Sequence, residues 1–203
     1  MRRWHFVVAG IAVGAAVGIY VARTRREPSK TTSPTSAREL RVPKLAAPIA
    51  LDGETDDPGW RQVARTGTFL TEAGEPARPY SDARFVWGDG KLWVLLYAAD
   101  EDIRSTDSFH LDIASHSFDV SPLGKVTLDG ALSAHDLDGT LDDPKDDDEE
   151  WVLELAIPLA ALGVEPKSGA RLPIAIHRCD TPKGSAKTCA QWGEQRPAVL
   201  VLD

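Results

Sequence analysis

The stretch Asp82–Asp100, DARFVWGDGKLWVLLYAAD, decides the fold class of this 203-residue chain. Two runs of strand-forming residues flank the dipeptide Asp89-Gly90, which is favoured in two-residue hairpin turns. The second run, Leu92–Ala99, is apolar on both faces, so we expect a central strand that is covered on both sides. The stretch therefore predicts a β-hairpin in the middle of a sheet.

Further strand-like segments follow along the chain. In Trp151–Pro158, WVLELAIP, every second residue is apolar on one face while Glu154 interrupts the other, which is typical of a strand. Pro158 can also open a short helical turn, PLAALG, which Gly163 would stop. Other strands are expected at 171–178 and 198–202 and, from weaker patterns, at 108–113 and 125–128. Many short strands and little helix predict an all-β fold, an antiparallel, jelly-roll-like β-sandwich.

Charge divides the chain into two parts. Residues 1–47 hold nine Lys or Arg and two acids, a net charge of +7, whereas residues 48–203 hold 14 Lys or Arg and 29 acids, a net charge of −15. An acidic body argues against nucleic acid as a partner, because neutralising phosphates requires clustered Lys and Arg. The basic N-terminal part would suit an anionic membrane surface.

The N-terminal segment 1–22 is predicted to be a membrane anchor. Its 19 residues Trp4–Ala22 are apolar apart from one histidine and are long enough to cross a hydrocarbon core as a transmembrane helix. A cleaved signal peptide is the alternative, although Tyr20 stands where a small residue is needed before the cleavage point. Residues 23–44, rich in Pro, Ser and Thr, are predicted to form a flexible linker to a folded domain at 45–203.

Two cysteines indicate where the domain resides. Cys179 and Cys189 flank a loop that contains Pro182 and Gly184, so the two ends of the loop can meet in a disulfide. Two free thiols are the alternative, while a zinc site is disfavoured because no histidine lies at ligand spacing. A disulfide together with an anchor predicts a domain held in the periplasm or the extracellular space.

Two acidic stretches raise the question of metal binding. Leu51–Trp60, LDGETDDPGW, is predicted to be a turn whose tryptophan packs into the core, with calcium held by Asp52 or Asp56 as the alternative. Residues 136–150 contain nine acids and one lysine and are predicted to form a solvated loop, with a weak cation site as the alternative. Neither stretch has the ligand spacing of an EF-hand.

Five segments occur together in one order: APIALDGETDDPGW, ARFVWGDGKLWVLLYAADEDI, DSFHLDI, WVLELAIPLAALGVEPKSGARLPIAIHR and AQWGE. In this combination the chain from Pro48 to Asp203 resembles the family 9 carbohydrate-binding modules and the wider sugar-binding-like superfamily that includes DOMON domains. The resemblance implies a β-sandwich of the kind attached to secreted polysaccharide-degrading enzymes. Some members of the family bind the ends of plant polysaccharides and carry structural calcium.

The ligand-binding residues of the resembling family match this chain only in part. Its members hold the sugar between two tryptophans, and the corresponding positions, near Arg104 and after Trp192, carry no aromatic residue. The remaining candidates for ligand binding are Trp192, Arg178, His110 and Lys125, of which the last two stand where the family places polar contacts. Each has a structural alternative: Trp192 as a packing residue, Arg178 paired with an acid, and His110 as a strand residue that faces solvent. Trp87, Trp93 and Trp151 are predicted to lie in the core.

No catalytic motif of hydrolases, zinc proteases or phosphate-binding proteins is present in the sequence. Met1 is the only methionine, so the Met/His haem ligation found elsewhere in the superfamily is not available. We therefore expect a non-catalytic carbohydrate-binding module, tethered to the cell envelope, associated with polysaccharide degradation and with a glycan as its partner. The alternatives are an envelope protein-interaction domain that has lost the sugar clamp and, more remotely, a glycoside hydrolase built on two of the acids.

Overall fold

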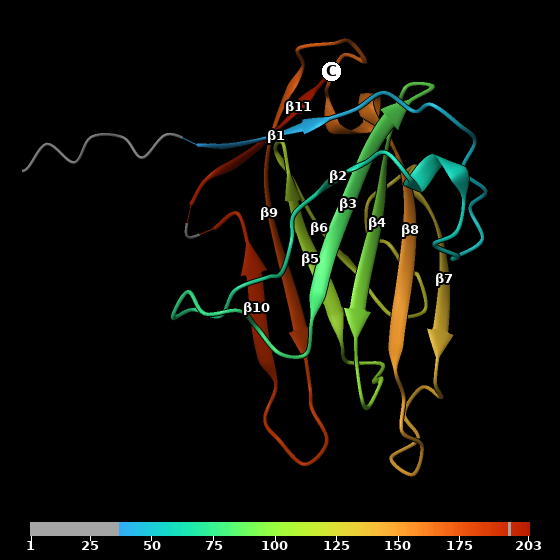
Figure 1. The fold of residues 1–203 in the computed structure, drawn as a ribbon, viewed down its shortest axis with the longest axis vertical. Helices are drawn as coiled ribbons and strands as arrows, with labels where there is room; N and C mark the ends of the chain where they lie inside the picture. Colours follow the sequence, from blue (N-terminus) through green and yellow to red (C-terminus); the bar gives the residue numbers. More distant parts are fainter. Residues whose placement is uncertain (1–36, 195) are drawn as a thin grey trace, which may run out of the picture. The chain divides into compact units, whose positions relative to one another are not determined.

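Two β-sheets packed face to face form the part of the chain that this computed structural model describes, residues 37–194 and 196–203 (Figure 1). The first sheet has the order β2-β3-β4-β8-β7, formed by β2 (Ala64–Arg65), β3 (Ser81–Gly88), β4 (Lys91–Ala99), β8 (Glu150–Pro158) and β7 (Leu132–Asp138). The second sheet has the order β1-β11-β9-β5-β6, formed by β1 (Arg38–Val42), β11 (Ala198–Leu202), β9 (Arg171–Asp180), β5 (Ser108–Ile113) and β6 (His116–Val120), with β10 (Thr188–Trp192) also paired to β9.

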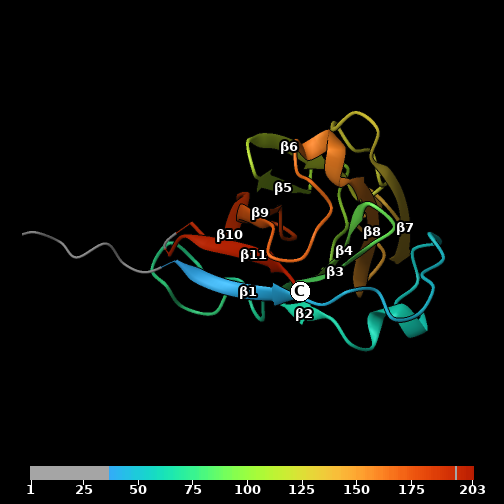
Figure 2. The ribbon, with the colours of Figure 1, turned by 90° about the horizontal axis from the view of Figure 1, so that it is seen from above.

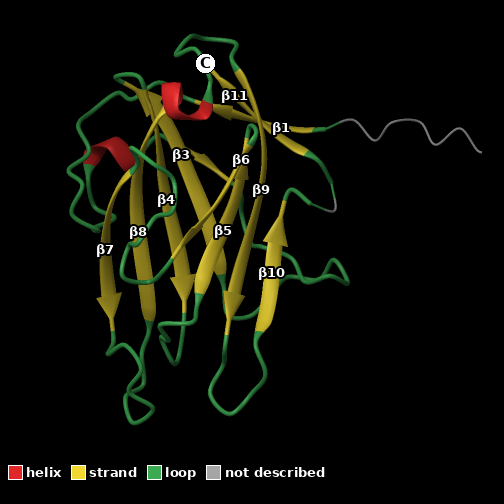
Figure 3. Cartoon of the chain, turned by 180° about the vertical axis from the view of Figure 1, so that it is seen from behind, coloured by secondary structure: helices red, strands yellow, loops and turns green. Residues whose placement is uncertain are grey.

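Seen from above, the sheets are separate layers, with β5, β6 and β9 in one and β3, β4, β8 and β7 in the other (Figure 2). The helical content of the described residues is limited to two short turns, η1 (Pro58–Trp60) and η2 (Leu159–Leu162), which lie at the same end of the sandwich (Figure 3). The predicted β-sandwich is therefore confirmed.

The predicted hairpin joins β3 to β4. Asp89 and Gly90 both have positive φ, 52° and 73°, as a two-residue turn of the mirror-image type requires. Strand β4 lies between β3 and β8, and Leu92, Val94 and Leu96 on its inner face are fully buried. The expected cover on both faces is present, because outer-face residues such as Leu95 are also inaccessible to solvent.

The main core lies between the two sheets. Its largest fully buried side chains are aromatic or long aliphatic residues drawn from both layers, and they include Trp151, Phe69, Phe85, Phe109 and Leu153. Trp87 joins this core as predicted. The prediction for Trp93 is wrong: it stands on the outer face of β4, half-buried, with the Lys91 ammonium 5.5 Å from the centre of its ring.

A loop covers the outer face of the first sheet and depends on one buried acid. Glu154 points outward from β8, and its carboxylate accepts hydrogen bonds from Trp60 Nε1 (2.6 Å), Gly53 N (2.9 Å) and Asp52 N (3.0 Å). Trp60 is buried against Val86 and other apolar residues of this face, so the predicted structural role of Leu51–Trp60 is confirmed. Burial raises the pKa of Glu154, against the effect of the three hydrogen bonds.

Gly53 fits this loop for a steric reason. Its φ is +95°, and a Cβ built on it would lie 2.4 Å from the carbonyl carbon of His135. Because another side chain would force the loop away from β7 and out of reach of Glu154, glycine is required at this position.

The domain begins earlier than the predicted residue 45, because strand β1 belongs to it. Arg38–Val42 lies within the predicted linker 23–44, yet it pairs in parallel with β11 from Arg38 opposite Ala198 to Val42 opposite Leu202. The domain predicted at 45–203 therefore includes β1, and the sandwich is not wholly antiparallel. The predicted anchor lies outside the described residues, among which no helix is both long enough and apolar enough to cross a membrane.

Two local predictions are also wrong. The acidic stretch 136–150 is not a solvated loop throughout, because it begins within β7 and contains the buried Asp148, which accepts hydrogen bonds from Ile103 N (2.6 Å) and Thr140 N (2.7 Å). The stretch 125–128 forms no strand, and only an isolated bridge joins Val126 to Val120 of β6.

We expect Glu154→Gln to lower the free energy of unfolding by about 1–3 kcal/mol, because the amide NH₂ would face at least one N–H donor. Urea denaturation measures the change. Glu165→Gln, in an exposed ion pair with Lys167, is the matched control and should stay within about 0.5 kcal/mol of the natural protein. Equal losses in the two variants would refute the anchoring role of Glu154.

Candidate functional site

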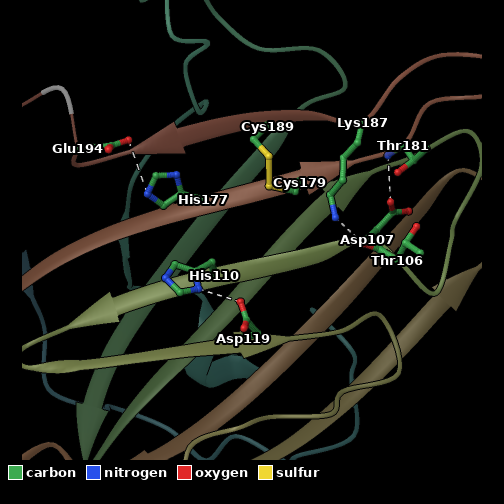
Figure 4. The surroundings of a disulfide bond; sticks show 10 residues. All are labelled: Thr106, Asp107, His110, Asp119, His177, Cys179, Thr181, Lys187, Cys189 and Glu194. Carbon is green, nitrogen blue, oxygen red and sulfur yellow. Dashed lines mark hydrogen bonds and ion pairs between the residues drawn. A yellow bond between two sulfur atoms is a disulfide. The ribbon is translucent and has the colours of Figure 1, made fainter.

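The outer face of the second sheet carries a continuous row of polar side chains, here called the polar strip. His110 of β5 lies directly between Asp119 of β6 and His177 of β9, and Thr127 N donates to the carbonyl of Asp119 and so extends the row beyond β6. Figure 4 shows His110, Asp119 and His177 side by side, with Glu194 next to His177. The strip consists of Lys125, Thr127, Ser117, Asp119, His110, Asp112, His177 and Glu194.

His110 has a polar side chain next to each of its ring nitrogens. Its Nδ1 lies 2.8 Å from Asp119 Oδ1, and its Nε2 lies 3.2 Å from Ser117 Oγ and 3.5 Å from Asp112 Oδ1. The Ser117 hydroxyl donates a short hydrogen bond to Asp112. The His177 ring centre is 6.1 Å from that of His110, and His177 Nε2 is 3.7 Å from Glu194 Oε2.

The four predicted ligand-binding residues do not come together. His110 and the exposed Lys125 share the outer face of the second sheet. Trp192 is only 4% exposed, pairs with Ile176 in the register of β10 and β9, and has the Arg38 guanidinium 5.5 Å from its ring centre. Its packing role, the structural alternative, is the one observed.

For Arg178 the structural alternative, pairing with an acid, is the one observed. Arg178 lies within β9 opposite Phe109, is 2% exposed and points into the sandwich. Its Nη2 donates to Asp100 Oδ2 (2.8 Å) and to Asp180 Oδ1 (3.2 Å). The reason is alternation along the strand: His177 faces outward, so Arg178 must face inward, where the two acids compensate its charge.

The acids around Arg178 form a buried cluster that the sequence analysis missed. Asp100 directly follows β4, Asp107 directly precedes β5 and Asp180 is the last residue of β9, and carboxylate oxygens of the three lie within 4.8 Å of one another. Asp100 also accepts from Trp151 Nε1 (3.0 Å), and Asp107 accepts from Thr181 N (3.0 Å). The available signal was an acid directly after the strongly apolar β4 and an acid at the end of the alternating strand β9.

This acid cluster carries more negative charge than Arg178 neutralises. Burial raises the pKa of Asp180 to about 6, and the nearby Asp100 and Asp107 add to the rise while Arg178 opposes it. Burial likewise raises the pKa of Asp107. Asp180 Oδ2 is buried and has no hydrogen-bond partner among the described residues. The arrangement favours an additional cation.

The family resemblance implies calcium, and two clusters of three acidic residues are the candidates for holding it. At Asp52, Asp57 and Glu154 both oxygens of Glu154 already accept hydrogen bonds, so this group does not fit a metal ion. The cluster of Asp100, Asp107 and Asp180 fits better, because all its donors are carboxylate oxygens and one of them is unpartnered.

A cleft of about 580 Å³ opens beside the acid cluster. Tyr80, 37% exposed, is its aromatic residue, and the Tyr97 ring supports it at a centre-to-centre distance of 5.9 Å. Asp82 accepts a 2.8 Å hydrogen bond from the Tyr80 hydroxyl and so fixes the ring. The cleft, here called the end cleft, is lined by Arg78, Pro79, Tyr80, Ala99, Asp100, Glu101, Asp102, Asp148, Glu149, Asp180, Pro182 and Lys183.

The disulfide predicted from the sequence is present on the outer face of the second sheet. Cys179 of β9 and Cys189 of β10 are directly opposite each other, with Cα atoms 4.1 Å apart (Figure 4). Lys187, in the loop that the disulfide closes, donates to the carbonyl of Thr106 (2.8 Å). These contacts hold the β9–β10 hairpin against the segment that leads into β5.

Comparisons with known proteins identify the fold. Family models give no match to this chain, and neither do curated protein sequences. Among solved structures, a family 9 carbohydrate-binding module from Caldicellulosiruptor kristjanssonii in complex with cellotriose matches with a TM-score of 0.57 at 13% identity, over 82% of this chain and 94% of the module. The same organism's family 9 module in complex with glucose matches with a TM-score of 0.57 at 14% identity, over 80% of this chain and 95% of that one.

A protein of Bacteroides uniformis that is proposed to bind carbohydrate also matches, with a TM-score of 0.57 at 14% identity, over 83% of this chain and all of that one. At these identities the matches establish the fold. The chain has a fold like that of family 9 carbohydrate-binding modules, which confirms the resemblance drawn from the sequence.

The disulfide generates a direct prediction. The unfolded, unreduced protein should show no free thiol in a colorimetric titration, and reduction should lower the free energy of unfolding by roughly 2–3 kcal/mol. A Cys179→Ala, Cys189→Ala double variant should show the same loss and no further change on reduction. Two titratable thiols per chain before reduction would contradict the prediction.

Proposed function

We propose that this chain is a non-catalytic carbohydrate-binding module and that the end cleft holds the sugar. The observation that carries the proposal is the likeness to modules whose structures contain cellotriose and glucose, in a chain whose described residues include an aromatic cleft of suitable size. Small-molecule sites have volumes of about 300–1,000 Å³, which includes the end cleft.

The chemistry of the end cleft suits a sugar ring. Tyr80 offers an aromatic face to the apolar side of the ring, and Asp82 fixes its orientation. Glu101 and Glu149 are exposed acceptors for sugar hydroxyls, and Lys183 adds a donor at the rim. In this proposal one tyrosine replaces the tryptophan pair of the resembling family, so we expect weaker binding than that of a two-sided clamp.

We also propose that the module works outside the cytoplasmic membrane. The apolar segment 4–22 would anchor it, and the residues before β1 would serve as a tether. The disulfide suits an oxidising compartment, and an envelope location would give the module access to polysaccharides and to the enzymes that degrade them.

Calorimetric titration of the full-length protein with cello- and xylo-oligosaccharides tests the sugar site. We expect binding that Tyr80→Ala weakens about tenfold or more, because the aromatic face is lost, and that Tyr80→Phe largely retains. His110→Ala, in the polar strip, is the second variant and should bind normally. Loss in His110→Ala with normal binding in Tyr80→Ala would instead place the sugar on the strip.

Two other results would replace the proposal. Absence of any glycan binding at millimolar sugar would favour the second candidate, an envelope protein-interaction domain. The observation behind that candidate is that the positions near Arg104 and after Trp192 lack the aromatic residues of the sugar clamp. Release of sugar from a polysaccharide would establish a glycoside hydrolase instead.

We propose in addition that Asp100, Asp107 and Asp180 hold a structural calcium ion. The ion would add the positive charge that Arg178 alone does not supply and would tie the end of β4, the start of β5 and the end of β9 together. It would thereby fix one wall of the end cleft, which Asp100 and Asp180 line.

Thermal unfolding of chelator-treated protein tests the calcium site. At a hundredfold excess over its Kd, calcium should raise Tm by roughly 5–10 °C. Asp180→Asn should remove most of this shift, yet be no less stable than the natural protein without calcium, because it removes an excess buried charge. Asp129→Asn, at an exposed position, is the matched control and should keep the full shift. An unchanged Tm in the natural protein would refute the proposal.

A further inference from the structure

Three electron-rich atoms lie close together in the polar strip: His110 Nε2, Ser117 Oγ and Asp112 Oδ1. Asp119 can only accept a hydrogen bond, so His110 Nδ1 must carry the proton that it donates across 2.8 Å. In the neutral imidazole the lone pair is then on Nε2. That lone pair faces Ser117 Oγ at 3.2 Å and Asp112 Oδ1 at 3.5 Å, and the single hydroxyl proton of Ser117 is already donated to Asp112. When the imidazole is neutral, no hydrogen bond or ion pair among the described residues brings a positive group to this point.

His177 stands beside this point with a similar arrangement. It is the cross-strand partner of His110, with ring centres 6.1 Å apart, and Glu194 Oε2 lies 3.7 Å from its Nε2. Each imidazole therefore has a carboxylate next to one nitrogen, as histidines that ligate metals usually do (Figure 4). At His110 the hydrogen bond to Asp119 fixes the tautomer and makes Nε2 a better ligand.

We propose that the polar strip binds one Zn²⁺ ion through His110 Nε2 and Asp112 Oδ1, with His177 completing the site by rotation of its half-exposed side chain. Imidazole and carboxylate are ligands that zinc accepts. The 3.5 Å between His110 Nε2 and Asp112 Oδ1 is close to the roughly 3.3 Å that separates two ligands each about 2 Å from a tetrahedral ion.

Sheet geometry holds these residues in place without the ion. His110 and Asp112 are alternate residues of β5, so they share one face, and the register of β5 with β6 and β9 fixes Asp119 and His177 on either side. The sulfurs of Cys179 and Cys189 are joined in the disulfide and offer no thiolate. The proposed site is therefore distinct from the acid cluster, which faces the opposite side of β9 and has no imidazole.

Calorimetric titration of ZnCl₂ into the untagged full-length protein, in buffer that contains calcium to occupy the acid cluster, tests the site. We expect one zinc ion per chain. His110→Asn and Asp112→Asn should each weaken binding about tenfold or more, and Asp119→Asn, which removes the orienting carboxylate, by about 10–100-fold. His135→Asn, at an exposed histidine of β7, is the matched control and should leave the affinity unchanged.

A second measurement distinguishes zinc binding at His110 from protonation of its ring and from misfolding of a variant. In ¹⁵N spectra of the histidines, Zn²⁺ should shift Nε2 of His110 while His135 stays unchanged, and thermal unfolding should confirm that each variant is folded. No zinc heat at millimolar concentration, unchanged affinity in His110→Asn, or a doubly protonated His110 ring that zinc does not displace would each overturn the proposal.

Discussion

Strand β4 is apolar on both faces, and the rest of the architecture follows from the need to cover it. One face is buried by the second sheet, which supplies Phe109 and other large side chains of the main core. The other face has no third sheet, so a loop must cover it, and a loop brings polar backbone groups that need partners. From within the sheet, Glu154 accepts hydrogen bonds from two backbone N–H groups of the loop, those of Asp52 and Gly53, and from the indole N–H of Trp60. Buried Glu154 thus allows an irregular loop to cover this face of the sheet in place of a third sheet.

The sequence was sufficient for the parts of the fold that depend on local chemistry. Asp89-Gly90 identified the hairpin because few residues tolerate the positive φ of its turn, and the alternation in Trp151–Pro158 identified a strand because one face is uniformly apolar. Strand β1 escaped detection because Val42 is its only fully buried residue, so its place is set by backbone pairing with β11 rather than by side-chain pattern. The burial of Asp148 was missed for a related reason, since its partners are backbone amides, and one of them, Ile103 N, is distant in sequence.

The candidate site was harder to predict because the register between strands decides which of its residues become neighbours, and the local sequence does not show that register. His110 and Lys125 were identified by family position and do share a face, but nothing local indicates that His177 would be the neighbour of His110. Arg178 shows the opposite error: an arginine near a strand end suggests solvent, whereas the phase of alternation set by Ile174 and Ile176 turns it inward. Its burial is compensated by Asp100, which follows β4, and by Asp180, two residues further along β9.

Strand β9 therefore separates two chemical environments by a single residue step. His177 faces a solvated strip of imidazoles and carboxylates, and Arg178 faces a buried cluster of three acids beside the end cleft. The same strand holds Cys179 on the outer face and Asp180 at the inner cluster, so the disulfide to β10 restrains the backbone from which both environments are built. Any ligand that displaces the end of β9 would act on both faces at once, since a strand cannot move one row of side chains without the other. Because neighbouring residues of a strand point to opposite faces, β9 holds two polar sites of opposite burial one residue apart.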